Sequence, residues 1–179
     1  MLRNAGERGL LEQFPAIVVA KPKAWNIESP LTERVLGDSH TRCCEGRSRM
    51  TRRYSSGTGW EPVVGYSRAV AAGDFVFVSG CTSVVGAELV HPGDAYAQTA
   101  QAISNVSAAL TGLGAGLGDV VRTRMYVTDI ARWEEFGRAH AEAFGDVRPA
   151  STMIEVAALI DPSLLVEVEA VAYRPGIGA

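Results

Sequence analysis

The chain has 179 residues, of which 47% are hydrophobic and 21% are charged. This composition excludes a disordered or membrane-embedded protein, and a chain of this length can bury a core without disulfide bonds. The 17 basic and 20 acidic residues give a net charge of −3, which provides no general attraction for nucleic acid or anionic lipid. We therefore expect neither of these as a partner.

The cysteines and the apolar segments indicate the cellular compartment. Cys43, Cys44 and Cys81 match neither a zinc-binding spacing nor a disulfide framework, so a reducing cytoplasm is the expected location. Residues 14–20 form a short apolar run without the features of a signal peptide. No run is long enough to span a bilayer, and no membrane association is expected.

Three regions are predicted along the chain. Residues 1–49 show no sustained hydrophobic period and are interpreted as an N-terminal extension. A start site assigned upstream of Met50 and a genuine flexible extension both explain this segment. Residues 50–175 are predicted to form one domain, and residues 176–179 a C-terminal tail.

The domain begins with three predicted strands. Residues 66–70 and 74–79 are rich in β-branched and aromatic side chains, and residues 71–74 form a turn between them. A further apolar run covers residues 82–90 and ends at the His91-Pro92-Gly93 sequence.

Two helices follow. Asp94 is a good N-cap, and apolar residues recur at helical spacing through to the glycines at positions 112, 114, 116 and 118. Asp129 is predicted to cap a second helix that ends at Gly145. The apolar positions are Tyr96, Ala100, Ile103, Val106 and Leu110 in the first helix and Trp133, Phe136, His140 and Phe144 in the second.

Strands at residues 120–127, 151–157 and 164–173 complete the pattern. The order strand, strand, strand, helix, strand, helix, strand, strand predicts an α+β fold whose two helices cover one face of the sheet. In the last strand the other face combines apolar residues with Glu167 and Glu169. Such a face fits either an oligomer interface or a solvated amphipathic surface.

Three segments in sequence order resemble the RidA/YjgF family of reactive-intermediate deaminases, also called L-PSP endoribonucleases. The segments are Gly65-Tyr66-Ser67-Arg68-Ala69-Val70 with Phe77-Val78-Ser79-Gly80, Arg148-Pro149-Ala150-Ser151-Thr152-Met153-Ile154-Glu155-Val156, and Leu165-Val166-Glu167-Val168-Glu169-Ala170-Val171-Ala172. The resemblance implies a chorismate-mutase-like fold with a mixed six-stranded sheet. It also implies a homotrimer with clefts between subunits, small imine or enamine substrates, and no metal or organic cofactor.

The resemblance assigns roles to four residues. Tyr66 falls on the cleft tyrosine, and Glu167 on the glutamate that positions the attacking water. Gly80 and Met153 fall where backbone groups line the cleft. Glu167 can equally be a structural glutamate at the trimer seam, and Tyr66 a packed aromatic residue at the start of a strand.

The sequence departs from the deaminases at Ser151, where they carry an arginine that binds the substrate carboxylate. Serine offers one neutral hydrogen bond in place of a bidentate, charge-assisted contact. Either another cation, Arg124, Arg148 or Arg68, takes over this role, or the substrate has no carboxylate. The sequence thus indicates a subgroup that lacks the substrate-carboxylate arginine.

The expected function is hydrolysis of a small imine, enamine or related electrophile. A non-catalytic trimer that binds small ligands or other proteins is the alternative, and an endoribonuclease is disfavoured by the negative net charge. Cys81 is not expected to be a nucleophile, because no neighbouring group in the sequence would activate it. His91 and His140 are interpreted as structural, because His91 lies in a turn and His140 on the apolar stripe of a helix.

Overall fold

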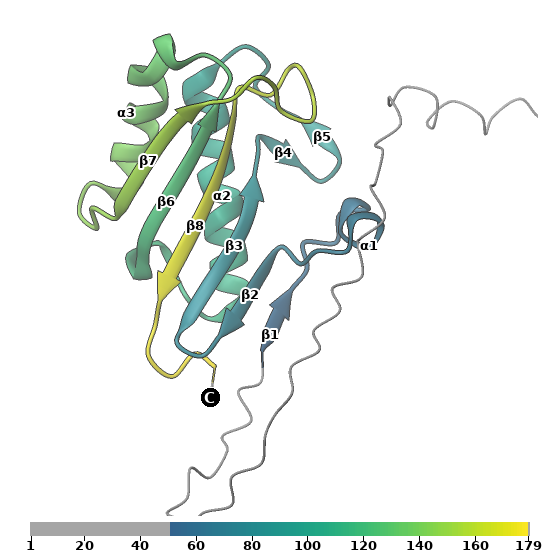
Figure 1. The fold of residues 1–179 in the computed structure, drawn as a ribbon, viewed down its shortest axis with the longest axis vertical. Helices are drawn as coiled ribbons and strands as arrows, with labels where there is room; N and C mark the ends of the chain where they lie inside the picture. The colour runs from purple at the N-terminus through teal and green to yellow at the C-terminus, as the bar shows by residue number, and fades with distance from the viewer. Residues whose placement is uncertain (1–50, 179) are drawn as a thin grey trace, which may run out of the picture. The chain divides into compact units, whose positions relative to one another are not determined.

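The structure is a computed structural model that describes residues 51–178 (Figure 1). The predicted N-terminal extension lies outside the described residues. A six-stranded sheet has the strand order β1-β2-β3-β8-β6-β7. Its strands are β1 Arg52–Tyr54, β2 Ala69–Ala72, β3 Phe75–Cys81, β6 Val120–Val127, β7 Ala150–Glu155 and β8 Val166–Tyr173.

The sheet is mixed. Adjacent strands are antiparallel except β6 and β7, which run parallel. A parallel pair needs a crossover connection, and helix α3, Trp133–Phe144, provides it. Helices α2 and α3 lie on the same face of the sheet (Figure 1). The predicted α+β fold with a mixed six-stranded sheet is confirmed.

Helix α2, Ala95–Leu113, begins and ends where the sequence predicts. The Asp94 carboxylate accepts a hydrogen bond from the backbone N–H of Ala97 at 2.9 Å, which satisfies one of the donors left unpaired at a helix N-terminus. Gly114 follows with φ 89°, and its backbone N–H binds the Leu110 and Thr111 carbonyl oxygens. A left-handed residue at this position is a common helix ending.

The second helix begins later than predicted. The Asp129 side chain accepts a hydrogen bond from the Ala131 backbone N–H at 3.0 Å and so caps a 3-10 turn, Ile130–Arg132. The α-helix starts only at Trp133. Turns of 3-10 geometry are frequent at the N-terminal ends of α-helices. The apolar spacing in the sequence did not reveal this turn.

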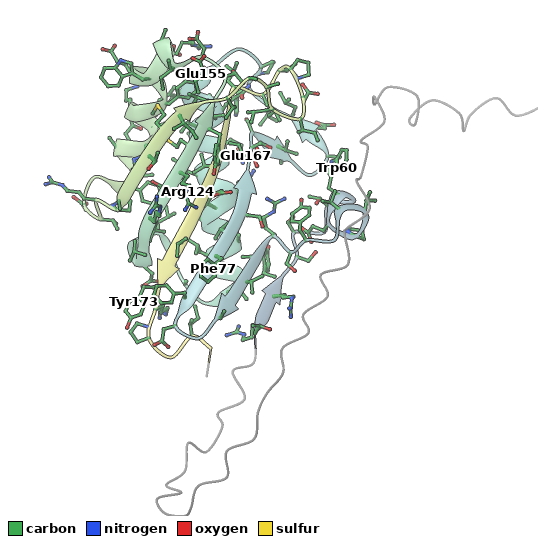
Figure 2. All side chains as sticks on the ribbon, viewed as in Figure 1. Trp60, Phe77, Arg124, Glu155, Glu167 and Tyr173 are labelled. Carbon is green, nitrogen blue, oxygen red and sulfur yellow. The ribbon has the colours of Figure 1, made fainter. Side chains whose placement is uncertain are left out.

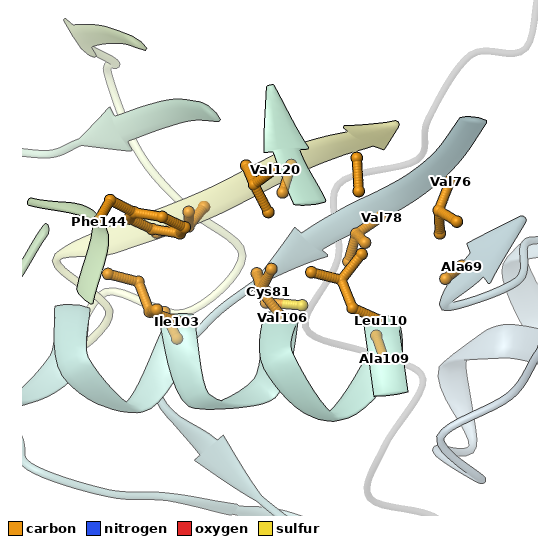
Figure 3. Packing of buried hydrophobic residues seen from close by; sticks show 14 of the residues in the cluster. Ala69, Val76, Val78, Cys81, Ile103, Val106, Ala109, Leu110, Val120 and Phe144 are labelled. Atoms are coloured by element: carbon orange, nitrogen blue, oxygen red, sulfur yellow. The ribbon is translucent and has the colours of Figure 1, made fainter. Parts of the chain in front are cut away.

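The core lies between the sheet and α2 (Figure 3). Val166, Val168, Ala170 and Ala172 of β8 are all buried, which confirms the predicted inward face of that strand. Val106 and Leu110 of α2 pack in the same cluster, together with residues of β3. Each fully buried valine or leucine stabilises the fold by roughly 1.5–3 kcal/mol relative to an exposed one.

Several short elements differ from the prediction. Residues 82–90 form a separate two-stranded hairpin, β4 Val84–Val85 and β5 Glu88–Leu89, instead of a strand of the main sheet. The main sheet instead contains β1 as one of its six strands, and the sequence did not predict this strand. Helix α1, Trp60–Val64, was also missed. Three to five residues are too few to show a hydrophobic period.

The C-terminal boundary of the domain also differs. Ile177 lies within the predicted tail but is 7% exposed and belongs to the core cluster. Its carbonyl oxygen accepts a hydrogen bond from Arg52 Nη1 at 3.0 Å. The packed domain therefore extends beyond residue 175. Within residues 51–178, no helix has the length and apolar character needed to cross a membrane.

Candidate functional site

A bulge in β3 creates the centre of the candidate site. Val78 pairs with Ala170 of β8, whereas Cys81 pairs with Val168, so the register shifts between these two positions. Bulges of this kind redirect side chains and occur often beside active sites. The bulge brings Gly80 against the side chain of Glu167, and a methyl group added at Gly80 would overlap the Glu167 carboxylate.

Glu167 projects from β8 on the sheet face turned away from α2 (Figure 2). Burial raises the pKa of this half-buried carboxyl group, the negative charge of Glu169 raises it further, and the Arg68 guanidinium opposes the rise. No hydrogen-bond donor from the described part of the chain is recorded for its oxygens. The carboxylate can therefore accept a hydrogen bond from water or a ligand.

Arg68 connects the other members of this site. Its Nη2 donates to the Tyr66 hydroxyl at 2.8 Å, and its Nη1 donates to the Gly80 carbonyl oxygen. Nη1 also lies 3.7 Å from Cys81 Sγ, and the guanidinium sits 5.3 Å from the centre of the Tyr66 ring. We call Tyr66, Arg68, Gly80, Cys81 and Glu167 the bulge cluster. The structure brings the predicted residues Tyr66, Gly80 and Glu167 together.

Glu61, which the sequence analysis missed, holds the chain in place just before Tyr66. This carboxylate is only 5% exposed and accepts hydrogen bonds from Ser55 Oγ, from Ser56 Oγ at 2.7 Å and from the Ser56 backbone N–H at 2.9 Å. Burial alone would raise its pKa, but these hydrogen bonds lower it below the usual value. The Tyr66 backbone N–H donates to the Glu61 carbonyl oxygen at 3.1 Å.

Arg124 lies on the same sheet face but is paired. Its Nη1 lies 3.2 Å from Glu169 Oε2, which also accepts a hydrogen bond from the Tyr126 hydroxyl at 3.2 Å. Burial and the Glu169 carboxylate raise the pKa of Tyr126. Beside this group is a hollow of about 260 Å³, lined in part by Phe77 and Val171. Glu169 is thus engaged by protein groups, whereas Glu167 is not.

The predicted residues of β7 lie elsewhere. Ser151 is opposite Thr123 of β6, on the helix side of the sheet, and Thr123 Oγ1 donates to Ser151 Oγ at 3.0 Å. Thr123 Oγ1 is also 2.9 Å from His140 Nε2. We call Thr123, His140 and Ser151 the edge cluster. Met153 packs partly against the core, so within one chain neither β7 residue joins the bulge cluster.

Arg148 has a local structural contact. It adopts φ 51° in the turn after α3, and its Nε donates to the Gly145 carbonyl oxygen at 3.1 Å. Its backbone N–H also binds the Phe144 carbonyl oxygen at 2.7 Å, so the residue closes the C-terminal end of α3. Among the described residues of one chain, Arg68 is the cation whose charge acts on Glu167.

Other reactive side chains of the described region offer no additional centre. Cys81 is 3% exposed, and burial raises the pKa of its thiol, which disfavours the reactive thiolate. Among residues 51–178, no group of three or more His, Cys, Asp or Glu side chains could hold a metal ion.

The family model for Endoribonuclease L-PSP matches residues 58–174. The chain belongs to this family, also known by the names YjgF and RidA. Its matched region contains both the bulge cluster and the edge cluster. The family relationship places the two clusters within a fold that is also seen in solved structures of other members.

Three relatives illustrate the range of the family. Protein SCO2049 of Streptomyces coelicolor is 42% identical over 130 residues, which cover 73% of this chain and 97% of that protein. The 3-aminoacrylate deaminase RutC of Acinetobacter baylyi is 32% identical over 113 residues, covering 63% and 89%. The structure of Rv2704 from Mycobacterium tuberculosis, described as a YjgF/YER057c/UK114 family member, is 51% identical. It covers 69% of this chain and 99% of that chain, with a TM-score of 0.64.

Proposed function

We propose that this protein is a hydrolase that deaminates a small imine or enamine, with Glu167 as the group that handles water. The observation that carries the proposal is the Glu167 carboxyl group, which is half-buried, has a raised pKa and lacks a recorded hydrogen-bond partner in the described chain. A carboxyl group with a pKa closer to neutrality is a better acid–base catalyst at physiological pH. The deaminase activity named for the RutC relative supports this reaction class.

The proposed reaction has two stages. Water adds to the imine carbon while Glu167 accepts one of its protons, and the nitrogen takes up a proton as the C=N double bond becomes single. The nitrogen then takes up a second proton, the C–N bond breaks and ammonia leaves, while Glu167 accepts the hydroxyl proton as the carbonyl group forms. An enamine enters the same sequence after protonation at carbon converts it to the imine. A single carboxyl group can accept and return protons in both stages.

The proposal includes a homotrimer with clefts between subunits. Several large apolar side chains on the sheet face away from the helices are more than 40% exposed: Phe75, Phe77, Ile154 and Tyr173. The Phe75 ring centre lies 5.1 Å from that of Tyr173 and 6.3 Å from that of Phe77. Such a surface favours burial against another copy of the chain. A cleft between copies would allow Ser151 of one subunit to approach Glu167 of another.

The proposed substrate lacks a carboxylate at the Ser151 end of this cleft. Arg124 is paired with Glu169, and Arg148 is bound to Gly145. Arg68 already donates to Tyr66 and Gly80. Losing a buried charge-assisted contact costs about 2–5 kcal/mol, so a neutral imine, enamine or carbonyl compound fits the side chains better than a 2-imino acid.

The test is ammonia release from freshly generated imines by the purified protein. An amine oxidase would supply imines without a carboxylate, and an amino-acid oxidase would supply 2-imino acids. We expect faster hydrolysis than background for the neutral imines, with a loss of about 100-fold or more in E167Q. Equal rates for wild type, E167Q and buffer would exclude this function.

The alternative is a trimer that binds small ligands without turnover. It is favoured by the absence of the carboxylate-binding arginine at Ser151 and by the use of Arg68 within the protein. A thermal shift induced by small carbonyl compounds without any hydrolysis would support this alternative. The endoribonuclease activity named by the family model is disfavoured by the net charge of −3.

A further inference from the structure

The edge cluster forms a continuous chain of hydrogen bonds from the inside of the protein to its surface. His140 is half-buried on α3, Thr123 is 0% exposed on β6, and Ser151 is exposed on β7. The distances along the chain are 2.9 Å from His140 Nε2 to Thr123 Oγ1 and 3.0 Å from Thr123 Oγ1 to Ser151 Oγ. The outer end is the position at which the family resemblance placed the substrate-binding arginine.

Thr123 differs from the other buried polar residues of the domain. Each of the others has a hydrogen bond to the backbone: Glu61 to Ser56, Ser83 to Val90, Gln98 to His91, Ser163 and Leu165, and Thr99 to Ala95. The recorded partners of the Thr123 hydroxyl are two side chains, His140 and Ser151. A valine would fill the same space without burying a polar group, so local backbone structure does not explain this threonine.

The hydrogens along this chain can point in two directions. When His140 Nε2 carries a hydrogen, Nε2 donates to Thr123, Thr123 donates to Ser151, and the Ser151 hydrogen is left for a ligand. When Nε2 is bare, Ser151 donates to Thr123 and Thr123 donates to His140, which leaves only lone pairs of Ser151 outward. Whether Nε2 of the half-buried His140 carries a hydrogen thus decides if Ser151 is a donor or an acceptor toward a ligand.

We propose that His140 and Thr123 are positioning residues that fix Ser151 as a hydrogen-bond donor for an uncharged acceptor, the carbonyl oxygen or imine nitrogen of the substrate. The inference rests on the proposed function, because it assumes that Ser151 faces the substrate. His140 and Thr123 thus have a role in specificity. A chain of neutral groups that ends at Ser151 replaces the arginine guanidinium that the deaminases carry at this position.

No charged side chain of the described residues contributes to the His140 titration. Burial alone lowers the pKa of its imidazole. Several charged groups on the elements around it have other contacts or face the opposite side: Arg122 and Arg124 line the hollow on the other face, Glu155 binds Ile130, Asp119 binds Arg174, and Arg138 and Glu142 contact Tyr96. A neutral ring is therefore the expected state at neutral pH, and because Thr123 Oγ1 donates its hydrogen to Ser151, Nε2 is the expected donor to Thr123.

The experiment combines ring-nitrogen NMR of His140 with the imine hydrolysis assay on the full chain. We call the chain of hydrogen bonds from His140 through Thr123 to Ser151 the relay. The variants T123V and H140F interrupt the relay with little change in side-chain volume. T123S keeps the hydroxyl, and H140Q keeps a donor at the same reach while removing titration. We expect T123V and H140F to lower kcat/KM for a neutral imine about tenfold, and T123S and H140Q to retain most of it.

The ring-nitrogen spectra test the relay independently of turnover. In wild type we expect the neutral tautomer with hydrogen on Nε2, and a change in the ring-nitrogen shifts or pKa of His140 in T123V and S151A at unchanged far-UV circular dichroism. Unchanged His140 signals in T123V would overturn the relay. An active wild type whose kcat/KM is the same in T123V would also overturn it, even if the signals respond.

A failure of the proposed function gives a different result. Wild type would then hydrolyse no imine, while the His140 signals would still respond to T123V and S151A. That outcome would reject both the hydrolysis and a role of the relay in specificity, and would leave the hydrogen-bonded chain as a structural feature. Misfolding of T123V would be recognised by circular dichroism, and S151A, at an exposed position, would then provide the same spectroscopic test.

Discussion

In the bulge cluster, Glu167 lies on the sheet face opposite to that of the edge cluster, and the two clusters offer a ligand different chemistry. At the bulge cluster, Glu167 and Arg68 are charged groups, and burial raises the pKa of the carboxyl group. At the edge cluster, two hydroxyl groups are aligned by a half-buried histidine. The comparison suggests that acid–base chemistry and ligand selection are carried by separate parts of the chain, and the variants below test this separation.

The largest effect is expected for G80A. The added methyl group would displace the flexible Glu167 carboxylate, so we expect kcat/KM to fall about 100-fold with little loss of stability. Imine hydrolysis and a thermal melt would measure the two effects. G59A is the matched control, because a methyl group there meets nothing within 4 Å. Unchanged His140 NMR signals in G80A would support the separation of the clusters, and full activity would contradict the role of Glu167.

The second effect concerns the support of Tyr66. In E61Q the buried side chain loses its charge-assisted hydrogen bonds from Ser55 and Ser56, which should lower the free energy of unfolding by about 1–3 kcal/mol. Urea denaturation at neutral pH would measure it, with the exposed Glu134 changed to Gln as control. Because hydrogen bonding lowers the pKa of Glu61, its contribution is lost as the pH falls through the folded-state pKa. A difference between wild type and E61Q that persists in acid would contradict this explanation.

A change of specificity is expected for S151R. An arginine at the exposed outer end of the edge cluster restores a possible bidentate contact with a carboxylate. We expect kcat/KM for a 2-imino acid to rise about tenfold, and that for a neutral imine to fall. The ratio of the two rates is the measurement, and S151K serves as the comparison because lysine lacks the bidentate geometry. An unchanged ratio in S151R would place Ser151 away from the substrate.

The smallest effect is on the stability of E167Q. Because burial raises the pKa of Glu167, the folded state holds this proton to a higher pH than the unfolded state does. The ionised group therefore opposes folding once the pH rises through its folded-state pKa. E167Q should require slightly more urea than wild type to unfold at neutral pH, and the difference should shrink in acid. A less stable E167Q at neutral pH would indicate a structural role for the carboxylate.

Much of the fold was predictable from the sequence. The alternation along residues 164–173 predicted the buried face of β8, and Asp94 predicted the start of α2, because both signals are local. The strand β1 is held by contacts distant in sequence, such as the hydrogen bond from Arg52 to Ile177, and the helix α1 is too short to show a hydrophobic period. Residues 82–90 were assigned to the main sheet because an apolar run does not distinguish a sheet strand from a separate hairpin.

The candidate site was predictable in part. The family resemblance named Tyr66, Gly80 and Glu167, but the position of Arg68 depends on the β3 bulge, for which the single glycine Gly80 is only a weak local signal. The contact of Ser151 with Thr123 and His140 depends on the parallel pairing of β6 and β7. The interpretation of His140 as purely structural followed from its position on an apolar stripe, and it did not take account of a polar partner from another strand.

The separation in sequence between paired strands affects when each cluster forms during folding. The strands β6 and β7 are joined by one connection, the 3-10 turn and α3, so the edge cluster needs only contacts that are comparatively close in sequence. The bulge cluster needs β3 and β8, which lie near opposite ends of the domain. Closing the longer loop costs more entropy and slows pairing. We therefore expect pulse-labelled hydrogen exchange to show protection of β6 before β3, so that the Glu167 site is assembled late in folding.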